Sequence, residues 1–361
     1  MMRLSCIKSR LLNGTAVLGL DIGYSIVKLV ELRKRNGNAE IRNYLFSDFD
    51  YNSSVPRSKQ AEELIKGLIR ENHIKTRKVV TAISNEDLIE RVFYLPLSSR
   101  DKIKDIVKWE VKKHINFPME EAVYSYITRE TEEAEKLCIY LAISKRDVVE
   151  RQIELLSRVG LEPLAIETKS TALNRLIQWS HADRAKETKI ALVDIGSKSS
   201  VFVLIDKGFI RMSKYIEIGS IDITSTIVNL IHCSEKDAEE LKMNIGIKEE
   251  VMNNRDSSPE SLDFNIYSAI EFQMDRLISE IKRALMFYFA QFEWEGDPDI
   301  MYITGGASRI PNITKFLSRK LSMEVEVLDP VDKFKCADCL DKGSATHLSI
   351  AFGLALREVC K

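Results

Sequence analysis

The stretch Leu18-Gly-Leu-Asp-Ile-Gly-Tyr-Ser-Ile-Val-Lys-Leu-Val-Glu31 has a counterpart later in the chain, Ala191-Leu-Val-Asp-Ile-Gly-Ser-Lys-Ser-Ser-Val-Phe-Val-Leu204. Each stretch is an apolar run, then Asp-Ile-Gly with polar residues, then a second apolar run rich in strand-forming residues. This order is typical of a β-hairpin whose glycine occupies the tight position. Asp21 and Asp194 are 173 positions apart, about half of the chain, so the repeat predicts two related lobes.

The size and composition of the chain agree with two lobes. At roughly 100 to 200 residues per domain, 361 residues correspond to about two domains. The 53 basic and 54 acidic residues nearly cancel, so we expect no nucleic-acid partner. The apolar run that follows the basic N-terminus comprises only residues 16–18, which is too short for a signal peptide. No apolar run in the sequence approaches the ~20 residues of a membrane span. Cysteines are sparse, and Cys336 and Cys339 lack a second pair, which favours a surface loop over zinc.

The pattern between the hairpins predicts a separate α+β segment. Helical periodicity covers residues 59–71, 100–115 and 145–159, and strand patterns cover 78–83, 91–95, 123–128 and 137–143. After the second hairpin we expect helices at 221–232, 235–243, 262–294, 312–321 and 349–359, and strands at 299–304 and 325–328. Residues 78–165 are therefore predicted to form a compact insert in the first lobe.

The hairpin turns carry residues suited to the phosphates of a nucleotide. Glycine permits close approach of the backbone, turn amides and serine hydroxyls donate to phosphate oxygens, and one carboxylate per lobe can hold Mg²⁺ through water. A single Asp-Gly hairpin is more often an ordinary turn, but two copies favour a clamp between lobes. The run Thr304-Gly-Gly-Ala-Ser-Arg-Ile-Pro311 offers a flat backbone surface for a purine, although alone it is as often structural. Walker A and Gly-x-Gly-x-x-Gly sequences are absent from the chain.

In order along the chain, these motifs resemble those of the actin-like ATPase superfamily. The passages are Gly19-Leu-Asp-Ile-Gly23, Leu192-Val-Asp-Ile-Gly196, Tyr302-Ile-Thr-Gly-Gly-Ala-Ser-Arg-Ile-Pro311 and Ala351-Phe-Gly-Leu-Ala-Leu356. Passages such as Arg91-Val-Phe-Tyr-Leu-Pro96 and Glu280-Ile-Lys-Arg-Ala-Leu-Met-Phe-Tyr288 are most similar to the PilM family of type IV pilus assembly. The resemblance implies an α/β, actin-like (ribonuclease H-like) duplicated two-lobe fold with an α+β insert subdomain in the first lobe.

The resemblance also implies the site residues. The predicted catalytic set is Asp21, Asp194 and Glu167, with Mg²⁺ held through water by the two aspartates and Glu167 near the attacking water. The phosphate-binding residues would be Gly23, Tyr24, Ser25, Lys28, Gly196, Ser197, Lys198 and Ser199. Glu239 and Lys242 would meet the ribose and adenine, and Gly305, Gly306 and Arg309 would lie by the adenosine. We expect ATP·Mg²⁺ binding with slow or negligible hydrolysis, because no strong general base is visible and Tyr24 replaces the usual small residue.

The resemblance further implies a peptide partner. In PilM-like proteins the insert helps form a groove for the N-terminal cytoplasmic tail of the membrane protein PilN, where main-chain hydrogen bonds and side-chain pockets give register and specificity. We expect a PilN-like tail as the partner, together with further contacts to other pilus assembly proteins. Self-association stays open. The protein would be cytoplasmic and reach the inner face of the membrane through this partner, without inserting into it. Trp109, Phe117 and Pro118 are candidate contacts, although a core position for Trp109 is equally expected.

Two other functions stay open on the sequence. A small-molecule kinase of the same superfamily would need a carboxylate base and a polar insert, whereas residues 78–165 are apolar and rich in strand formers. An FtsA-like filament former or membrane tether would carry an amphipathic tail, and none is expected beyond the last helix at Lys361.

The predicted division follows from these motifs. It comprises a tail (1–14), the first-lobe core (15–77), the insert (78–165), a first connecting helix (166–187), the second-lobe core (188–225), an outer subdomain (226–298), the returning core (299–342) and a second connecting helix (343–361).

Overall fold

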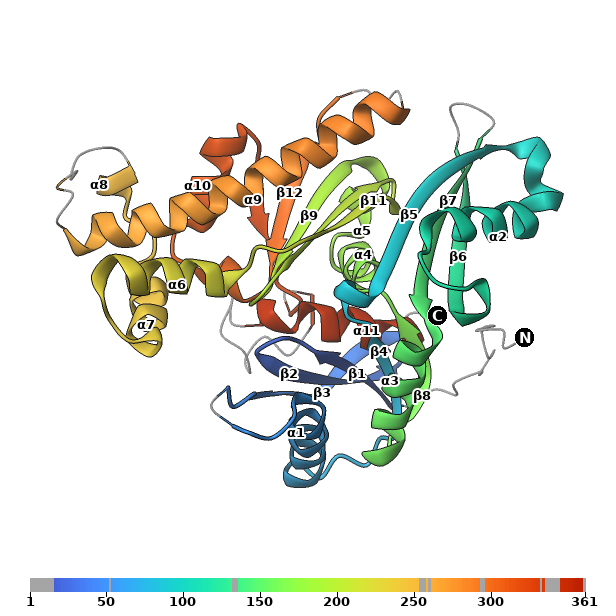
Figure 1. Ribbon diagram of the computed structural model, residues 1–361, viewed down its shortest axis with the longest axis horizontal. Coiled ribbons are helices and arrows are strands. Elements are labelled where there is room, and N and C mark those ends of the chain that lie inside the picture. Colours follow the sequence, from blue (N-terminus) through green and yellow to red (C-terminus); the bar gives the residue numbers. More distant parts are fainter. Residues whose placement is uncertain are drawn as a thin grey trace.

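The computed structural model describes residues 16–51, 53–131, 136–252, 258, 261–292, 296–331, 333–334 and 345–359. The expected tail at 1–14 and the Cys336 and Cys339 pair lie outside these residues. Two lobes lie one above the other in Figure 1, with a third, smaller body beside the upper one.

Each lobe is built on a five-stranded mixed sheet with the same strand order. Lobe 1 contains β1 (Ala16–Ile22), β2 (Ile26–Arg35), β3 (Asn38–Asp48), β4 (Lys78–Ala82) and β8 (Glu162–Glu167), ordered β3-β2-β1-β4-β8. Lobe 2 contains β9 (Lys189–Ile195), β10 (Ser200–Asp206), β11 (Phe209–Ile216), β12 (Ile300–Thr304) and β13 (Val325–Val327), ordered β11-β10-β9-β12-β13. In both sheets, the first three strands of this spatial order are antiparallel to one another, and the last two strands are added in parallel. The predicted repeat is therefore a duplication of a whole sheet.

Two helices between the sheets join the lobes (Figure 1): α4 (Lys169–Ser180) and α11 (Ser349–Val359). Both contribute buried apolar side chains to one core that they share with strands of the two lobes. Gly353 is required where they cross, because a Cβ there would overlap the backbone carbonyl of Ala172. Gly19 of β1 is required for the same reason beneath Ala351.

The body beside the sheets is a separate three-stranded sheet with one helix, which we call the insert. It contains η1 (Asn85–Asp87), β5 (Leu88–Pro96), η2 (Leu97–Lys102), α2 (Ile103–His114), η3 (Met119–Glu121), β6 (Ala122–Thr131) and β7 (Lys136–Lys145), ordered β5-β7-β6. Val107 and Val111 of α2 lie on one helical face and pack against Ile139, Leu141 and Ile143 of β7.

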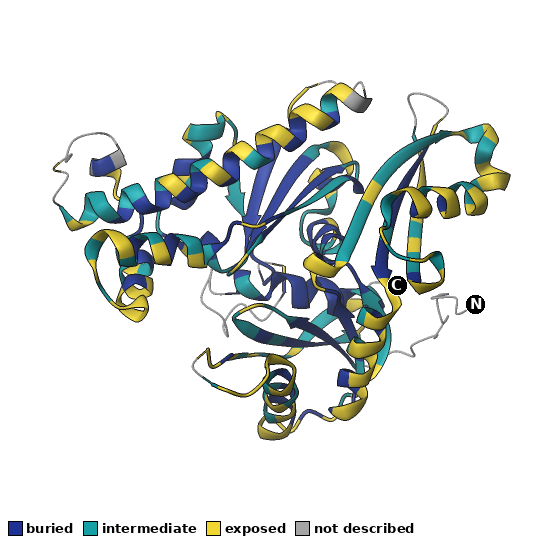
Figure 2. Ribbon diagram, in the orientation of Figure 1, coloured by how far each residue is buried: buried dark blue, intermediate teal, exposed yellow. Residues whose placement is uncertain are grey.

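The remaining helices cover the sheets. They are α1 (Arg57–Glu71) and α3 (Arg146–Arg158) in lobe 1, and α5 (Ala182–Glu187), α6 (Ser220–Ile231), α7 (Glu235–Ile245), α8 (Glu249–Met252), α9 (Leu262–Phe292), η4 (Gly306–Arg309), α10 (Ile313–Leu321) and η6 (Thr346–Leu348) in or beside lobe 2. Figure 2 shows α9 with alternating buried and exposed residues, since one face packs on the sheet and the other lies in solvent.

The expected elements differ from the structure at several places. The third strands β3 and β11 were not predicted, although Asn36-Gly37 and Lys207-Gly208, all at positive φ, form the tight hairpin turns that precede them. The expected insert was too large, because β4 and β8 pair into the lobe 1 sheet. The first connecting helix was expected from residue 166 but begins at Lys169, since β8 extends to Glu167 and the Thr168 hydroxyl caps the helix by accepting from the Thr171 amide at 3.1 Å.

Candidate functional site

The two Asp-Ile-Gly turns have the same geometry. The Gly23 amide donates to the Ile26 carbonyl at 3.0 Å, and the Gly196 amide donates to the Ser199 carbonyl at 3.0 Å. A Cβ on either glycine would come within 3 Å of that same carbonyl oxygen, so both positions need glycine. We call residues 23–25 loop 1 and residues 196–199 loop 2.

Loop 1 and loop 2 meet across the two lobes. The Ser25 and Ser197 hydroxyls are hydrogen-bonded to each other. Behind loop 2, the Ser220 amide at the start of α6 donates to the Gly196 carbonyl at 2.9 Å, and Gly219 leaves room for the Ser197 carbonyl. The serines that were expected to hold phosphate thus lie side by side on opposite lobes.

Two buried carboxylates lie at the base of these loops. Lys28 of β2 donates to Asp21 at 2.9 Å. Burial works against ionisation of Asp21, yet the Lys28 ammonium, with Lys169, holds the pKa of Asp21 below its ordinary value. Burial raises the pKa of Asp194, against the opposing effect of Lys28 and Lys169. The pKa of Lys28 lies above its ordinary value despite its burial, because both aspartates attract its charge.

The third glycine motif approaches Asp194. Gly305 has φ of +86°, and a Cβ there would lie 2.5 Å from the Asp194 carboxylate oxygen. A Cβ at Gly306 would meet nothing within 4 Å, so the backbone of η4 borders open space. The Arg309 side chain at the end of η4 is exposed. The structure therefore brings the adenosine candidates Gly305 and Gly306 next to loop 2.

The Tyr24 ring packs against side chains of both lobes. Its side chain is 41 % exposed, and its ring lies against the rings of Tyr51 and the guanidinium of Arg57, with centroid distances of 5.9 and 4.9 Å. Arg57 also donates to the Gly23 and Tyr24 carbonyls. On its lobe 2 side, Tyr24 faces Lys198, whose Nζ is 5.3 Å from the ring centroid.

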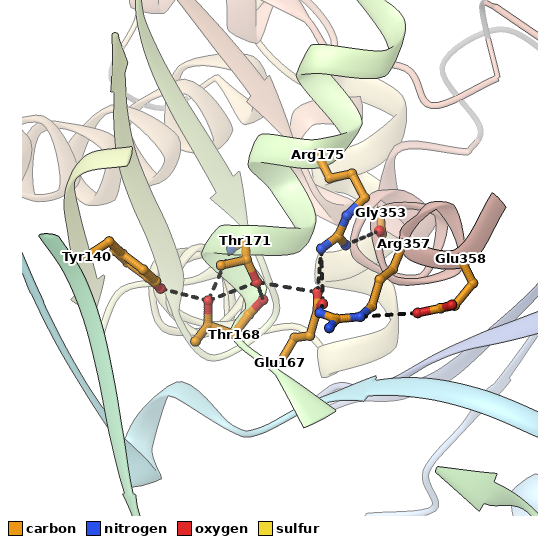
Figure 3. A network of polar contacts seen from close by, with 8 residues as sticks. All are labelled: Tyr140, Glu167, Thr168, Thr171, Arg175, Gly353, Arg357 and Glu358. Carbon is orange, nitrogen blue, oxygen red and sulfur yellow. Dashed lines mark hydrogen bonds and ion pairs between the residues drawn. The ribbon is translucent and has the colours of Figure 1, made fainter. Parts of the chain in front are cut away.

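Glu167 is buried in an ion-pair cluster (Figure 3). Its carboxylate accepts from Arg175 at 2.9 and 3.0 Å, pairs with Arg357 of α11, and accepts from the Thr171 hydroxyl at 3.4 Å. Arg175 also donates to the Gly353 carbonyl at 2.7 Å. A carboxylate held by two guanidinium groups is a poor base, so this geometry does not favour the expected contact with an attacking water.

Lys242 of α7 is fully buried. Its ammonium donates to the Ser220 and Thr224 hydroxyls at 2.6 and 2.8 Å and to Glu239 at 2.5 Å. Burial lowers the pKa of Lys242 against the attraction of Glu239. Contact with adenine needs an exposed ammonium, and the ammonium of Lys242 is buried. The Glu239 side chain, in contrast, is half exposed. The geometry does not favour the expected contact of Lys242 with adenine. Instead, the hydrogen bonds of Lys242 join α7 to α6.

Four residues near the loops were not predicted from the sequence: Tyr51, Arg57, Lys169 and Glu86. Lys169 attracts both Asp21 and Asp194, and the Tyr51 hydroxyl interacts with Ser25 and Ser197. Lys169 lies within the connecting-helix motif, so a signal for it was present. The other three come from segments that become neighbours of the loops only after folding.

Within the described ranges, no group of three or more His, Cys, Asp or Glu side chains could hold a metal ion. No helix in these ranges is both long and apolar enough to cross a membrane.

Solved structures define the class of this fold. The chain matches a structure titled as the PilM-PilN type IV pilus biogenesis complex with a TM-score of 0.78 and 24 % identity, covering 95 % of this chain and 98 % of that one. It matches the ethanolamine utilization protein EutJ from Carboxydothermus hydrogenoformans (TM-score 0.54, 14 % identity, 96 % and 90 % covered). It also matches MreB5 of Spiroplasma citri bound to AMPPNP (0.50, 12 %, 94 % and 94 %). The fold is that of the actin-like ATPases, which confirms the predicted fold class.

The family model for type IV pilus assembly protein PilM matches residues 19–359. The chain belongs to this family and is an actin-like protein of type IV pilus assembly, as its sequence motifs predicted.

Proposed function

We propose that the protein binds ATP·Mg²⁺ between its lobes and, in that form, engages the cytoplasmic tail of a PilN-like membrane protein. The observation that carries the nucleotide site is the meeting of loop 1 and loop 2 through Ser25 and Ser197, above the carboxylates of Asp21 and Asp194. Similar glycine turns on opposite lobes give a phosphate chain donors from both sides. The structure of MreB5 with AMPPNP has the same fold and adds support.

The donor set fits a magnesium nucleotide. Lys28 and Lys169 supply two positive charges beside Asp21 and Asp194, which suits a ligand that carries phosphates and a cation together. Magnesium would be held by the aspartates through its waters and would offset the phosphate charge. The open backbone at Gly306 leaves room for the adenosine, with Gly305 and Arg309 beside it.

We propose that ATP hydrolysis is slow or negligible. Glu167, the expected catalytic carboxylate, is engaged by Arg175 and Arg357. An ionised carboxylate with two cationic partners has little tendency to accept a proton from water. Loop 1, Lys28 and loop 2, which includes Lys198 and Ser199, would then bind and orient phosphate without supplying a base.

A titration with a fluorescent ATP analogue in Mg²⁺ tests the nucleotide site. We expect saturable binding by the wild-type chain. Asp194→Ala should bind at least tenfold more weakly, because the loss of a hydrogen bond to a charged group costs a comparable free energy. Arg309→Ala tests the exposed adenosine flank and should weaken binding by a smaller factor. The proposal would be contradicted by a lack of saturable binding, or by binding that Asp194→Ala leaves unchanged.

For the partner, the insert is the element to which we assign the peptide site. The structure of the PilM-PilN complex shares the fold over 95 % of this chain. The insert sheet ends in the edge strand β6, and Trp109 on α2 is 58 % exposed. An edge strand with a neighbouring exposed aromatic suits an extended tail. Such a tail would bring the protein to the cytoplasmic face of the membrane, where other pilus proteins and further copies of this chain could assemble.

Binding of synthetic peptides tests this assignment. We expect a peptide from the N-terminal tail of a PilN-like protein to bind with micromolar or tighter affinity, and a scrambled peptide of equal charge not to bind. Trp109→Ala should weaken the first interaction, whereas Phe272→Ala, which removes an equally exposed aromatic from α9, should not. If every pilus inner-membrane tail fails to bind, with and without ATP, a filament-forming or kinase function gains support.

We also propose the division of the chain along the observed sheets. Among the described residues, lobe 1 would consist of 16–84 and 146–167, with the insert between them, and lobe 2 of those from 188 to 334. The connecting helices α4 and α11 would act as the hinge.

A further inference from the structure

Glu86 connects the insert to loop 2. One of its carboxylate oxygens accepts from Lys198 Nζ at 2.9 Å and from the Tyr215 hydroxyl at 3.1 Å. Glu86 lies in η1, immediately before β5, while Lys198 and Tyr215 belong to lobe 2. The Lys198 ammonium lowers the pKa of Glu86, and Glu86 raises the pKa of Lys198, so both groups are charged at neutral pH. A single carboxylate therefore joins the start of the insert to a predicted phosphate-binding residue.

The contact of Glu86 with Tyr215 is the first of a row of contacts with β11, which continues along β5. Further along β5, Glu90 accepts from the Ser213 hydroxyl at 2.8 Å, and the Tyr94 hydroxyl is 3.5 Å from Arg211. Glu90 and Tyr94 are half-buried, whereas the side chains of Glu86 and Lys198 are 46 % and 49 % exposed. Exposed ion pairs are weak and exchange partners easily. This end of the row can open while the deeper contacts persist.

We propose that Glu86 competes with the terminal phosphate of a bound nucleotide for Lys198, so that nucleotide binding releases the start of β5 from lobe 2. The inference rests on the proposed ATP site. A phosphate group presents several charged oxygens to an ammonium and is a stronger partner than one solvated carboxylate. Because the insert begins at η1, the exchange carries the state of the nucleotide site to the subdomain that we assign to the partner tail. Glu86 acts through Lys198 and is thus a positioning residue.

Nucleotide affinity of Glu86→Gln tests the competition. This variant should bind the ATP analogue about two- to fivefold more tightly than wild type, the range expected for one exposed ion pair. Asp87→Asn is the matched control, since it removes an equal charge from the neighbouring exposed position and no bond of that carboxylate is present among the described contacts. In a Lys198→Met background, Glu86→Gln should have no further effect. Equal effects of the two charge removals, or a gain that persists without Lys198, would overturn the inference.

Amide hydrogen exchange gives a second readout that a purely structural role would not change. In the wild type, saturating nucleotide should speed exchange of residues 85–90, and in Glu86→Gln these amides should exchange rapidly before nucleotide is added. Unchanged protection in the nucleotide-bound wild type contradicts the release. If the wild type shows no nucleotide binding at all, the proposed function fails together with the competition. If it binds and Glu86→Gln matches Asp87→Asn, only the competition fails.

Discussion

Asp21 is a buried carboxylate whose charge is held by Lys28 at 2.9 Å. Its folded-state pKa lies below the ordinary value, so the ion pair stabilises the folded chain above the unfolded pKa of about 4. The contribution is lost as the pH falls through the lower folded-state pKa. The same lysine is drawn toward Asp194, so one cation serves both hairpins.

We expect Asp21→Asn to lower the free energy of unfolding by about 1 to 3 kcal/mol at pH 7. Urea denaturation of both proteins between pH 7 and pH 3.5 checks this expectation. The difference should stay constant down to about pH 5 and shrink below about pH 4. A difference that grows on acidification would show that the carboxylate does not favour its charged form in the folded state.

At the scale of elements, the crossing of α4 and α11 depends on one glycine. Gly353→Ala would force a methyl group into the Ala172 carbonyl, so we expect a loss of about 1 to 3 kcal/mol in stability. Gly67→Ala, within α1, provides the matched substitution. Its Cβ would meet only the flexible Glu71 side chain at 3.7 Å, so helix propensity should stabilise the chain by about 0.5 to 1 kcal/mol. Opposite shifts in the thermal midpoint are the expected result, and two shifts of the same sign would contradict the crossing.

The Glu167 cluster ties β8 to the same two helices. Glu167→Gln leaves Arg175 and Arg357 without their buried carboxylate, and we expect it to cost about 2 to 4 kcal/mol. Glu162→Gln, an exposed change on the same strand, should cost little. Chemical denaturation measures both. A catalytic role without a structural one predicts the reverse outcome, namely unchanged stability with lost ATP turnover.

For the whole molecule, the insert is attached to lobe 2 as well as to lobe 1. The Tyr94 hydroxyl of β5 and the Tyr288 hydroxyl of α9 are hydrogen-bonded at 2.8 Å, and burial raises the pKa of Tyr94 to about 12, which keeps that phenol protonated. The Tyr140 hydroxyl bonds Glu90 and Thr168, so the insert also contacts α4. Any rotation of lobe 2 about the connecting helices therefore changes contacts of the insert.

Tyr288→Phe should lower the free energy of unfolding by about 1 kcal/mol, since it removes a buried hydrogen bond between these bodies. Tyr124→Phe on β6 removes a hydroxyl that makes no bond among the described contacts, so it should cost less. Differential scanning calorimetry of the two variants would detect the difference. Equal midpoints would show that the Tyr94–Tyr288 bond adds nothing to the attachment of the insert.

Local patterns in the sequence determined a large part of this molecule. The repeated Asp-Ile-Gly hairpins, the Gly305-Gly306 turn and the periodic helices predicted the duplicated fold and the loops of the site, because glycine geometry and apolar periodicity act over a few residues. The family followed from the order of these motifs. The third strand of each sheet also has a local signal, because the tight turns at Asn36-Gly37 and Lys207-Gly208 precede β3 and β11.

Only the tertiary structure decided which side chains meet across long separations. The pairing of β4 and β8 with lobe 1, the capture of Glu167 by Arg175 and Arg357, and the burial of Lys242 have no local signature. The same holds for the contact of Glu86 with Lys198, which are 112 positions apart. Strand pairing and ion pairing depend on distance in space, and that distance is set by packing of the whole chain, so residue type alone predicts the loops but not the partners of their charged groups.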